Sequence, residues 1–222
     1  MSAVVRAAVP SSLLARLRAV TERPEERLSL APVLGVEIDD ALAGGLLRGA
    51  IVEIAAPHGR ARATAFALSA CLAAQRDARR FGSHALCAWI DPTRSLFGPG
   101  LAARGLDLSR LLVVAPTLEL FPRAAVRVVE SRAFSVVVID ARSLASLERW
   151  PTAVRRLALA VEGTACSVLL VTDLSARRSV PLPTASRIEL SCKGPGALTL
   201  RVAKDRHGRI ASDRTLAWRQ SA

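Results

Sequence analysis

Short apolar runs alternate along most of the chain with segments whose apolar residues recur at helical spacing. Five runs are apolar almost throughout and predict buried strands. They cover residues 50–55, 85–90, 111–115, 135–139 and 167–171. The amphipathic segments between them predict helices at about 62–80, 119–131 and 147–161. Apolar strands separated by helices are typical of an α/β fold, with a mainly parallel twisted sheet that helices cover on both faces.

The pattern changes after residue 183, where no further helix is predicted. Residues 187–191 and 197–203 form two strand-like segments, and the turn-forming stretch from Lys193 to Gly196 separates them. Two strands joined by such a turn predict an antiparallel hairpin. We expect this C-terminal hairpin to lie at the edge of the sheet.

The first residues of the chain stand apart from this alternation. Leu13, Leu14 and Leu17 fall on one face of a short predicted helix, and a charged, proline-interrupted stretch follows it. We therefore expect an N-terminal helix and linker at 1–28, followed by one core domain with a basic C-terminal segment at 29–222. An isolated helix of this length is marginal in water, so it either docks on its own core or contacts a partner through these leucines.

Composition limits the classes of protein to which the chain can belong. Its 222 residues are 51% hydrophobic and 23% charged, which fits one globular domain and disfavours disorder. No apolar run approaches the roughly 18 residues of a membrane span, and the start does not have the pattern of a secretory signal. The four cysteines are not spaced as metal ligands, so we expect reduced thiols, no metal site, no membrane partner and a cytoplasmic protein.

The chain is strongly basic, with a formal net charge of +12 from 31 basic and 19 acidic residues. More than half of the excess lies after residue 176, and this distribution indicates a nucleic acid or an acidic protein as partner. The candidate DNA or phosphate contacts are Arg177, Arg178, Lys204, Arg206 and Arg209. The alternatives are a genome-wide arginine bias and a charged, solvated turn at Gly208.

Aromatic residues, on which single-stranded bases stack, are scarce in this sequence. Only Phe97, Trp150 and Trp218 are expected to be exposed, so any contact with single-stranded DNA is expected to be weak and not sequence-specific. Trp218 and Arg219 are of types enriched in interface hot spots. They either contact a partner or pack back on the sheet edge.

The loop after the first predicted strand occupies the position of a phosphate-binding loop, whose pattern is G-x-x-x-x-G-K-[ST]. All four fixed positions depart from that pattern; they are Ala56, Ala61, Arg62 and Ala63. The alanines add Cβ atoms where the backbone needs free angles, and Ala63 has no hydroxyl to hold Mg²⁺. We expect a degenerate phosphate loop that does not support efficient NTP hydrolysis.

Two further residues of this degenerate loop are Gly59 and Arg60. Arg60 and Arg62 lie at a helix N-terminus, where backbone N–H groups and the helix dipole favour an anion. The alternative is a solvated loop that binds nothing. The sequence leaves both readings open.

Several segments resemble RecA-type recombinases. Residues 44–54 resemble the glycine pair and first core strand of that family. The segments 88–91, 105–112 and 136–140 follow in the family's order and spacing. The resemblance covers about residues 30–210 and implies a RecA-like core.

The departures from the recombinase pattern indicate a branch of the family. Thr93 stands where the resemblance places the catalytic glutamate, and the γ-phosphate sensor is replaced around Thr172 and Asp173. Asp140 matches the Walker B aspartate, but Ala63 deprives it of its metal-binding companion. The resemblance therefore implies no catalytic residue and no bound cofactor.

A compact RecA-like chain without working ATPase residues is similar to the ImuA family of the bacterial SOS mutagenesis cassette. That resemblance implies a non-catalytic adaptor in damage-induced translesion synthesis. Its partners would be an ImuB-like Y-family protein, an error-prone replicative-type polymerase and RecA. The alternatives are a recombinase paralogue that binds DNA or weakly binds ATP, and an SOS cell-division inhibitor.

Overall fold

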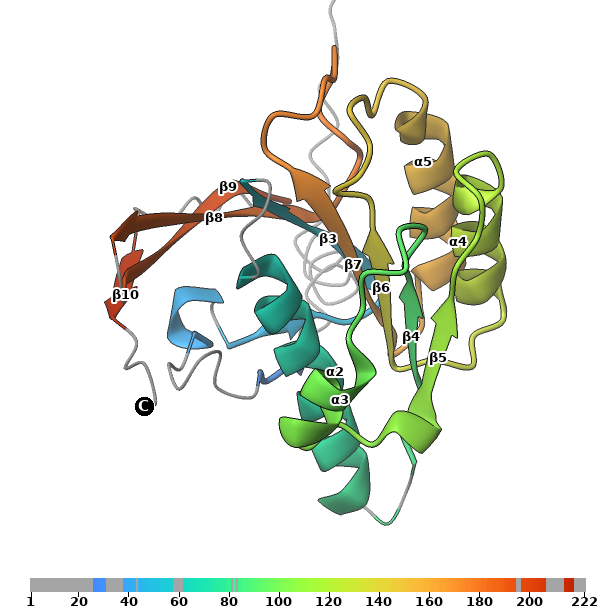
Figure 1. Ribbon diagram of the computed structural model, residues 1–222, viewed down its shortest axis with the longest axis vertical. Helices are drawn as coiled ribbons and strands as arrows, with labels where there is room; N and C mark the ends of the chain where they lie inside the picture. The colour runs from blue at the N-terminus through green and yellow to red at the C-terminus, as the bar shows by residue number, and fades with distance from the viewer. Residues whose placement is uncertain are drawn as a thin grey trace, which may run out of the picture.

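An eight-stranded sheet forms the centre of the molecule, with helices on both of its faces (Figure 1). The structure is a computed structural model. It describes residues 26–30, 38–42, 44–57, 62–80, 82, 84–194, 197–206 and 214–217. The predicted N-terminal helix with Leu13, Leu14 and Leu17 lies outside these residues, as do Arg209, Trp218 and Arg219.

The strand order across the sheet is β10-β9-β8-β3-β7-β6-β4-β5. Every neighbouring pair from β8 to β5 is parallel, whereas β9 pairs antiparallel with both β8 and β10. The strands are β3 (Ala50–Ala56), β4 (Cys87–Ile90), β5 (Leu111–Val114), β6 (Val136–Asp140), β7 (Ser167–Asp173), β8 (Ser186–Gly194), β9 (Ala197–Asp205) and β10 (Arg214–Ala217). The predicted hairpin is confirmed, and β10 adds one more antiparallel strand to it.

Helices cover the parallel part of the sheet because its strands are apolar on both faces. The helices α2 (Arg62–Arg80) and α3 (Gly98–Ala103) lie on one side, and α4 (Phe121–Glu130) and α5 (Trp150–Val161) lie on the other (Figure 1). Every residue of β3, β6 and β7 is buried. The predicted α/β class is confirmed.

Alternate residues of β3, β4, β6 and β7 enter two separate hydrophobic cores. Val52 of β3 packs with Phe66 of α2 in one core, whereas Ile51 enters the other core, under α4 and α5. The prediction that Trp150 is exposed is wrong, because its ring is 4% exposed and packs edge-to-face on Phe121 with centroids 5.0 Å apart. That contact joins the starts of α4 and α5.

Short elements precede the core sheet. The strands β1 (Arg27–Leu28) and β2 (Leu46–Leu47) pair antiparallel, so the end of the expected linker is part of a small sheet. Gly45 is required there, since its φ is +116° and a Cβ would lie 2.2 Å from the carbonyl oxygen of Leu28. The 3₁₀ turns are η1 (Asp40–Leu42) and η2 (Leu108–Arg110).

Two expectations from composition bear on these elements. Cys71, Cys87 and Cys166 are buried free thiols, and Cys192 is half-buried and free. Within the part of the chain that the structure describes, no helix is both long and apolar enough to cross a membrane.

Candidate functional site

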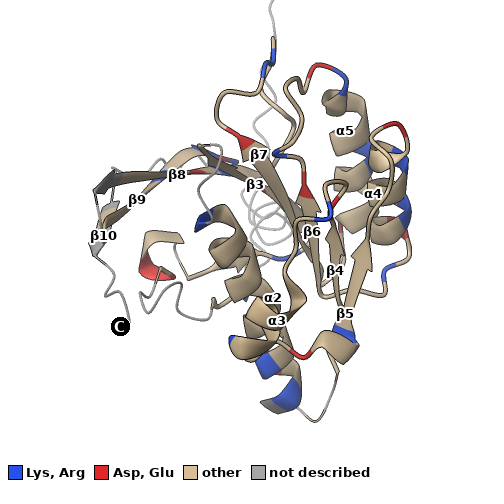
Figure 2. Cartoon of the chain, in the orientation of Figure 1, with Lys and Arg blue, Asp and Glu red and all other residues tan. Residues whose placement is uncertain are grey.

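The carboxyl ends of the parallel strands bring polar side chains to one edge of the sheet. Asp91 follows β4, Asp140 ends β6 and Asp173 ends β7, and each of the three is at most 5% exposed. Figure 2 shows acidic positions at the carboxyl ends of β6 and β7. In parallel α/β sheets this edge is where ligands bind, so it is the first candidate site.

Asp140 forms a two-pronged ion pair with Arg142. The guanidinium Nε lies 2.9 Å from one carboxylate oxygen, and Nη2 lies 2.5 Å from the other. The hydrogen bond to Asp140 raises the pKa of Arg142, burial opposes this shift, and the negative charges of Asp140, Asp91 and Asp173 add to it. Arg142 therefore neutralises Asp140, and its charge is also attracted by the two neighbouring carboxylates.

Asp91 is occupied by the turn that follows it. Its carboxylate accepts hydrogen bonds from the Thr93 hydroxyl at 2.6 Å and from the backbone N–H of Leu96 at 2.9 Å. Burial disfavours its ionised form, but the bonds from Thr93, Leu96 and Ser95 outweigh burial and hold the pKa of Asp91 below its ordinary value. The Thr93 hydroxyl therefore stabilises a carboxylate.

The start of α2 is apolar where the degenerate loop meets the helix. Ala63 is fully buried in the core under this helix, and Ala56, at the end of β3, is 1% exposed. Gly59, Arg60 and Ala61 lie outside the described residues, whereas Arg62 opens α2. The described part of the loop thus places methyl groups beside the acidic edge.

Comparison with solved structures decides the fold family. The crystal structure of the RadB recombinase aligns with a TM-score of 0.62 at 15% sequence identity, covering 81% of this chain and 92% of that chain. The chain has a RecA-like fold. No family model matches the sequence, and no curated protein matches it either.

A RecA-like fold implies a magnesium nucleotide at this edge, and the residues present do not fit one. Both carboxylate oxygens of Asp140 accept bonds from Arg142, and the side chain at position 63 is a buried methyl group. A guanidinium beside the aspartate repels a metal cation. Among the described residues, no group of three or more histidine, cysteine, aspartate or glutamate side chains could hold a metal ion.

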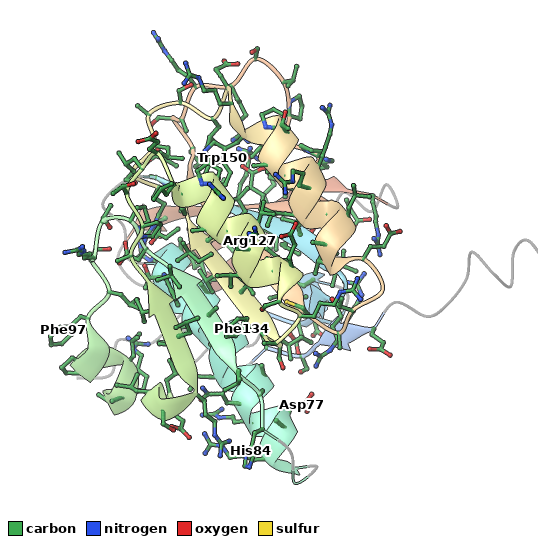
Figure 3. All side chains as sticks on the ribbon, turned by 90° about the vertical axis from the view of Figure 1, so that its right-hand side faces the viewer. Asp77, His84, Phe97, Arg127, Phe134 and Trp150 are labelled. Carbon is green, nitrogen blue, oxygen red and sulfur yellow. The ribbon has the colours of Figure 1, made fainter. Side chains whose placement is uncertain are left out.

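A cavity of about 300 Å³ lies beside Asp140 and Arg142, between the first turns of α2 and α3. Phe97, 69% exposed, lies at its rim and projects outward, as predicted (Figure 3). Arg104 also lines this cavity. Its described acidic group is the ion-paired Asp140, which makes the cavity poorly suited to acid–base chemistry.

A buried glutamate next to this edge was missed by sequence reasoning. Glu53 of β3 is 1% exposed and accepts bonds from the Thr172 hydroxyl at 2.8 Å, Arg178 Nη1 at 2.7 Å and Arg187 Nη1 at 3.0 Å. Its signal in the sequence is a single charged residue in an apolar strand. A buried carboxylate of this kind requires paired cations.

The structure places the predicted phosphate contacts in different environments. Arg178 pairs with Glu53, and Lys204 Nζ donates to the carbonyl oxygen of Leu182 at 3.0 Å. Burial lowers the pKa of Lys204, and the charge of Glu53 opposes that shift. Arg177 and Arg206 are exposed. Two of these four cations therefore have internal roles.

Proposed function

We propose that this chain is a non-catalytic, RecA-like adaptor in damage-induced translesion DNA synthesis. Its proposed partners are an ImuB-like Y-family protein, an error-prone replicative-type polymerase and RecA. Two lines of argument support the proposal: the chemistry of the carboxyl edge, and the resemblance of the sequence motifs to the ImuA family. The RecA-like fold is shared with the RadB recombinase, and this likeness supports a role connected with DNA.

The observation that carries the non-catalytic part is the ion pair between Asp140 and Arg142. For Mg²⁺ to bind this aspartate, the guanidinium would first have to leave a carboxylate that is 5% exposed. Removing one partner of a buried pair costs about 3–5 kcal/mol. Thr93 has no carboxylate to act as a base, and Ala63 has no hydroxyl to bind the metal, so this edge is poorly suited to nucleotide turnover.

The partner assignment rests on the motifs. The segments 44–54, 88–91, 105–112 and 136–140 keep the recombinase order, whereas the residues that perform its chemistry are replaced. A recombinase-like core that keeps its fold but lacks the residues for ATP hydrolysis supports a role in binding other proteins. The ImuA resemblance supplies the identity of those proteins.

A hydrolysis assay tests the non-catalytic part. Purified full-length protein is incubated with ATP and Mg²⁺, with and without single-stranded DNA, beside an Asp140→Asn variant as control. We expect the same background release of phosphate from both proteins. A rate well above background that Asp140→Asn abolishes would overturn this part of the proposal.

A binding assay tests the adaptor part. The tagged full chain is isolated from cells after DNA damage, with nuclease treatment to remove complexes bridged by DNA. We expect it to retain the ImuB-like protein, and purified ImuB-like protein to bind it directly. Absence of that complex with both purified proteins would contradict the adaptor function.

A further inference from the structure

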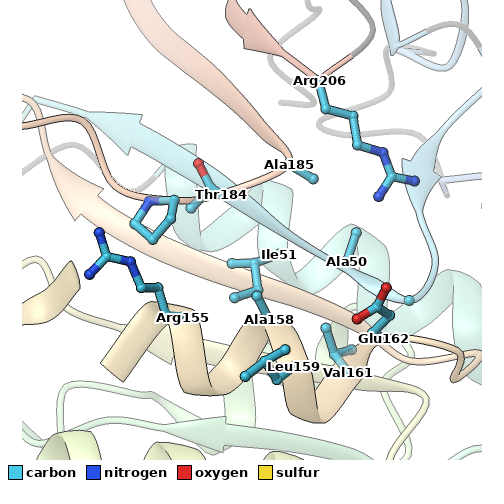
Figure 4. A pocket seen from close by; sticks show the side chains of 12 residues that line it. Ala50, Ile51, Arg155, Ala158, Leu159, Val161, Glu162, Thr184, Ala185 and Arg206 are labelled. Carbon is cyan, nitrogen blue, oxygen red and sulfur yellow. The ribbon is translucent and has the colours of Figure 1, made fainter. Parts of the chain in front are cut away.

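A second hollow lies far from the acidic site, near the amino ends of the parallel strands. It has a volume of about 490 Å³ and lies between α5, the start of β3 and the segment 183–185 (Figure 4). We call it the α5 pocket. Its size falls within the roughly 300–1,000 Å³ of typical ligand sites.

The floor of the α5 pocket is apolar and its ends are charged. Ile51 and Ala158 lie along the middle, with Arg155 at one end and Arg206 at the other (Figure 4). Leu159 at the edge of the pocket is 72% exposed, the highest exposure among the large hydrophobic residues of the described chain. An apolar centre with a polar rim is the composition of a protein-binding hot spot.

The charge of the α5 pocket is uneven. Glu162 lies at the same end as Arg206 and partly offsets its charge (Figure 4). For Arg155, no carboxylate partner is found in the part of the chain that the structure describes. The next residue, Arg156, instead pairs with Glu130 of α4 at 3.5 Å. The two neighbouring arginines thus face different surroundings, Arg155 the pocket and Arg156 the helix α4.

We propose that the α5 pocket is the docking site for an acidic peptide segment of a partner protein. One or two large apolar side chains of that segment contact Ile51, Ala158 and Leu159, and a carboxylate beside them pairs with Arg155. This inference rests on the proposed adaptor function. It assigns the partner contact to the face opposite the degenerate nucleotide site.

Two other occupants fit the α5 pocket less well. No lining residue is aromatic, so single-stranded bases find no stacking surface. Glu26 lies near the pocket, because its carbonyl oxygen accepts a bond from the backbone N–H of Arg48, the residue before Gly49 in the pocket wall. The N-terminal segment that precedes Glu26 in the sequence has no carboxylate next to Leu13, Leu14 and Leu17.

Three short fluorescent peptides test the proposal on the full-length chain. The first has Leu-Phe between glutamates, the second replaces the glutamates by lysines, and the third replaces Leu-Phe by Ala-Ala. We expect the first to bind with a roughly micromolar dissociation constant in a fluorescence anisotropy titration. The other two are expected to bind at least about tenfold more weakly, because each lacks half of the recognition chemistry.

Variants of α5 assign the binding to the pocket. Arg155→Glu is expected to lower the affinity for the first peptide by about tenfold or more, and Leu159→Gln is expected to lower it by a similar factor. Arg156→Glu is the matched control, since it makes the same charge change one residue along, at a side chain that faces α4 instead of the pocket. Equal effects of the two glutamate variants, or equal binding of the glutamate and lysine peptides, would overturn the proposal.

Two more outcomes would assign the α5 pocket to a different occupant and so contradict the proposal. One is binding of labelled oligothymidine that Arg155→Glu abolishes while the acidic peptide does not bind. The other is a gain of about tenfold in peptide affinity when Leu13, Leu14 and Leu17 are all replaced by serine, which would identify the N-terminal segment as the occupant. Thermal unfolding of each variant confirms that it is folded.

The failure of this inference can be told apart from failure of the adaptor function. If Arg155→Glu still binds the ImuB-like protein as the unmodified chain does, the α5 pocket is wrong and the adaptor function stands. If the acidic peptide binds at Arg155 but the ImuB-like protein does not bind at all, the pocket stands and the proposed partner is wrong.

Discussion

Arg142 provides the positive charge that the buried carboxylates of the carboxyl edge require. Its guanidinium holds both oxygens of Asp140, and the charges of Asp91 and Asp173 act on it as well. Sequence reasoning found Asp140 but not its partner two residues later, because a pattern does not show where an arginine side chain folds back. The degenerate loop was visible in the sequence because each departure adds, removes or changes a specific chemical group.

Replacing Arg142 tests how strongly the fold depends on this cation. Arg142→Ala leaves the carboxylate of Asp140 buried and unpaired, and we expect the free energy of unfolding to fall by about 3 kcal/mol. Arg142→Lys retains a charge but loses the two-pronged geometry, so we expect a smaller loss. Urea denaturation at neutral pH measures both. A change in Arg142→Ala below about 1 kcal/mol would show that the pair has little structural importance.

The pKa of Asp91 depends on hydrogen bonds from the turn that follows it. Because the folded-state pKa lies below the ordinary value of 3.8, ionised Asp91 contributes stability at neutral pH. That contribution is lost as the pH falls below 3.8 and through the folded-state pKa. Thr93→Val removes the hydroxyl donor, so the pKa of Asp91 should rise. The free energy of unfolding at neutral pH should fall by about 1 kcal/mol.

Titration of the Asp91 carboxyl carbon by NMR measures this shift. Thr152→Val, an exposed change of the same chemistry on α5, is the control and should leave the pKa of Asp91 where it is. A Thr93→Val protein with an unaltered Asp91 pKa would mean that the backbone donors alone hold the carboxylate ionised.

At the level of elements, hydrophobic periodicity predicted the long, regular helices and missed a short one. The helix expected at about 62–80 is found as α2, Arg62–Arg80, because its apolar positions recur over many turns. The helix α3 was missed, since its six residues include two glycines and a proline. The burial of Trp150 depends on Phe121 of another helix. Such contacts between distant elements are absent from a local pattern.

The connection between β7 and β8 contributes a buried ion pair to the sheet, in addition to its backbone hydrogen bonds. Arg178 lies in that connection, its side chain is 15% exposed, and it pairs with the 1% exposed Glu53 of β3. We expect Arg178→Ala to lower the free energy of unfolding by about 3 kcal/mol, because it removes one of the two cations beside a buried carboxylate. Urea denaturation measures the loss.

The neighbouring residue provides the control for that element. Arg177→Ala makes the same chemical change at an exposed side chain and should alter stability by less than about 0.5 kcal/mol. If both variants lose the same stability, the connection is not held by Glu53. If Arg178→Ala leaves stability unchanged but abolishes DNA binding, the arginine serves an external ligand.

Over the whole molecule, the net charge of +12 does not describe one continuous basic surface. Arg178 and Arg187 are paired with Glu53, and Lys204 donates to a backbone carbonyl, so part of the C-terminal excess stabilises the fold. Arg177 and Arg206 remain exposed. The charge imbalance thus indicates less nucleic-acid contact than its size suggests.

The salt dependence of single-stranded DNA binding tests how much of the positive charge is available to contact phosphates. Each phosphate neutralised on a single strand adds about −0.7 to the slope of log K against log salt. If Arg177 and Arg206 make the contacts, replacing both by alanine should make the slope shallower by about 1.4. Anisotropy of labelled oligothymidine at several salt concentrations measures it, with Arg123→Ala on α4 as the control. An unchanged, steep slope in the double variant would place the DNA contact elsewhere on the chain.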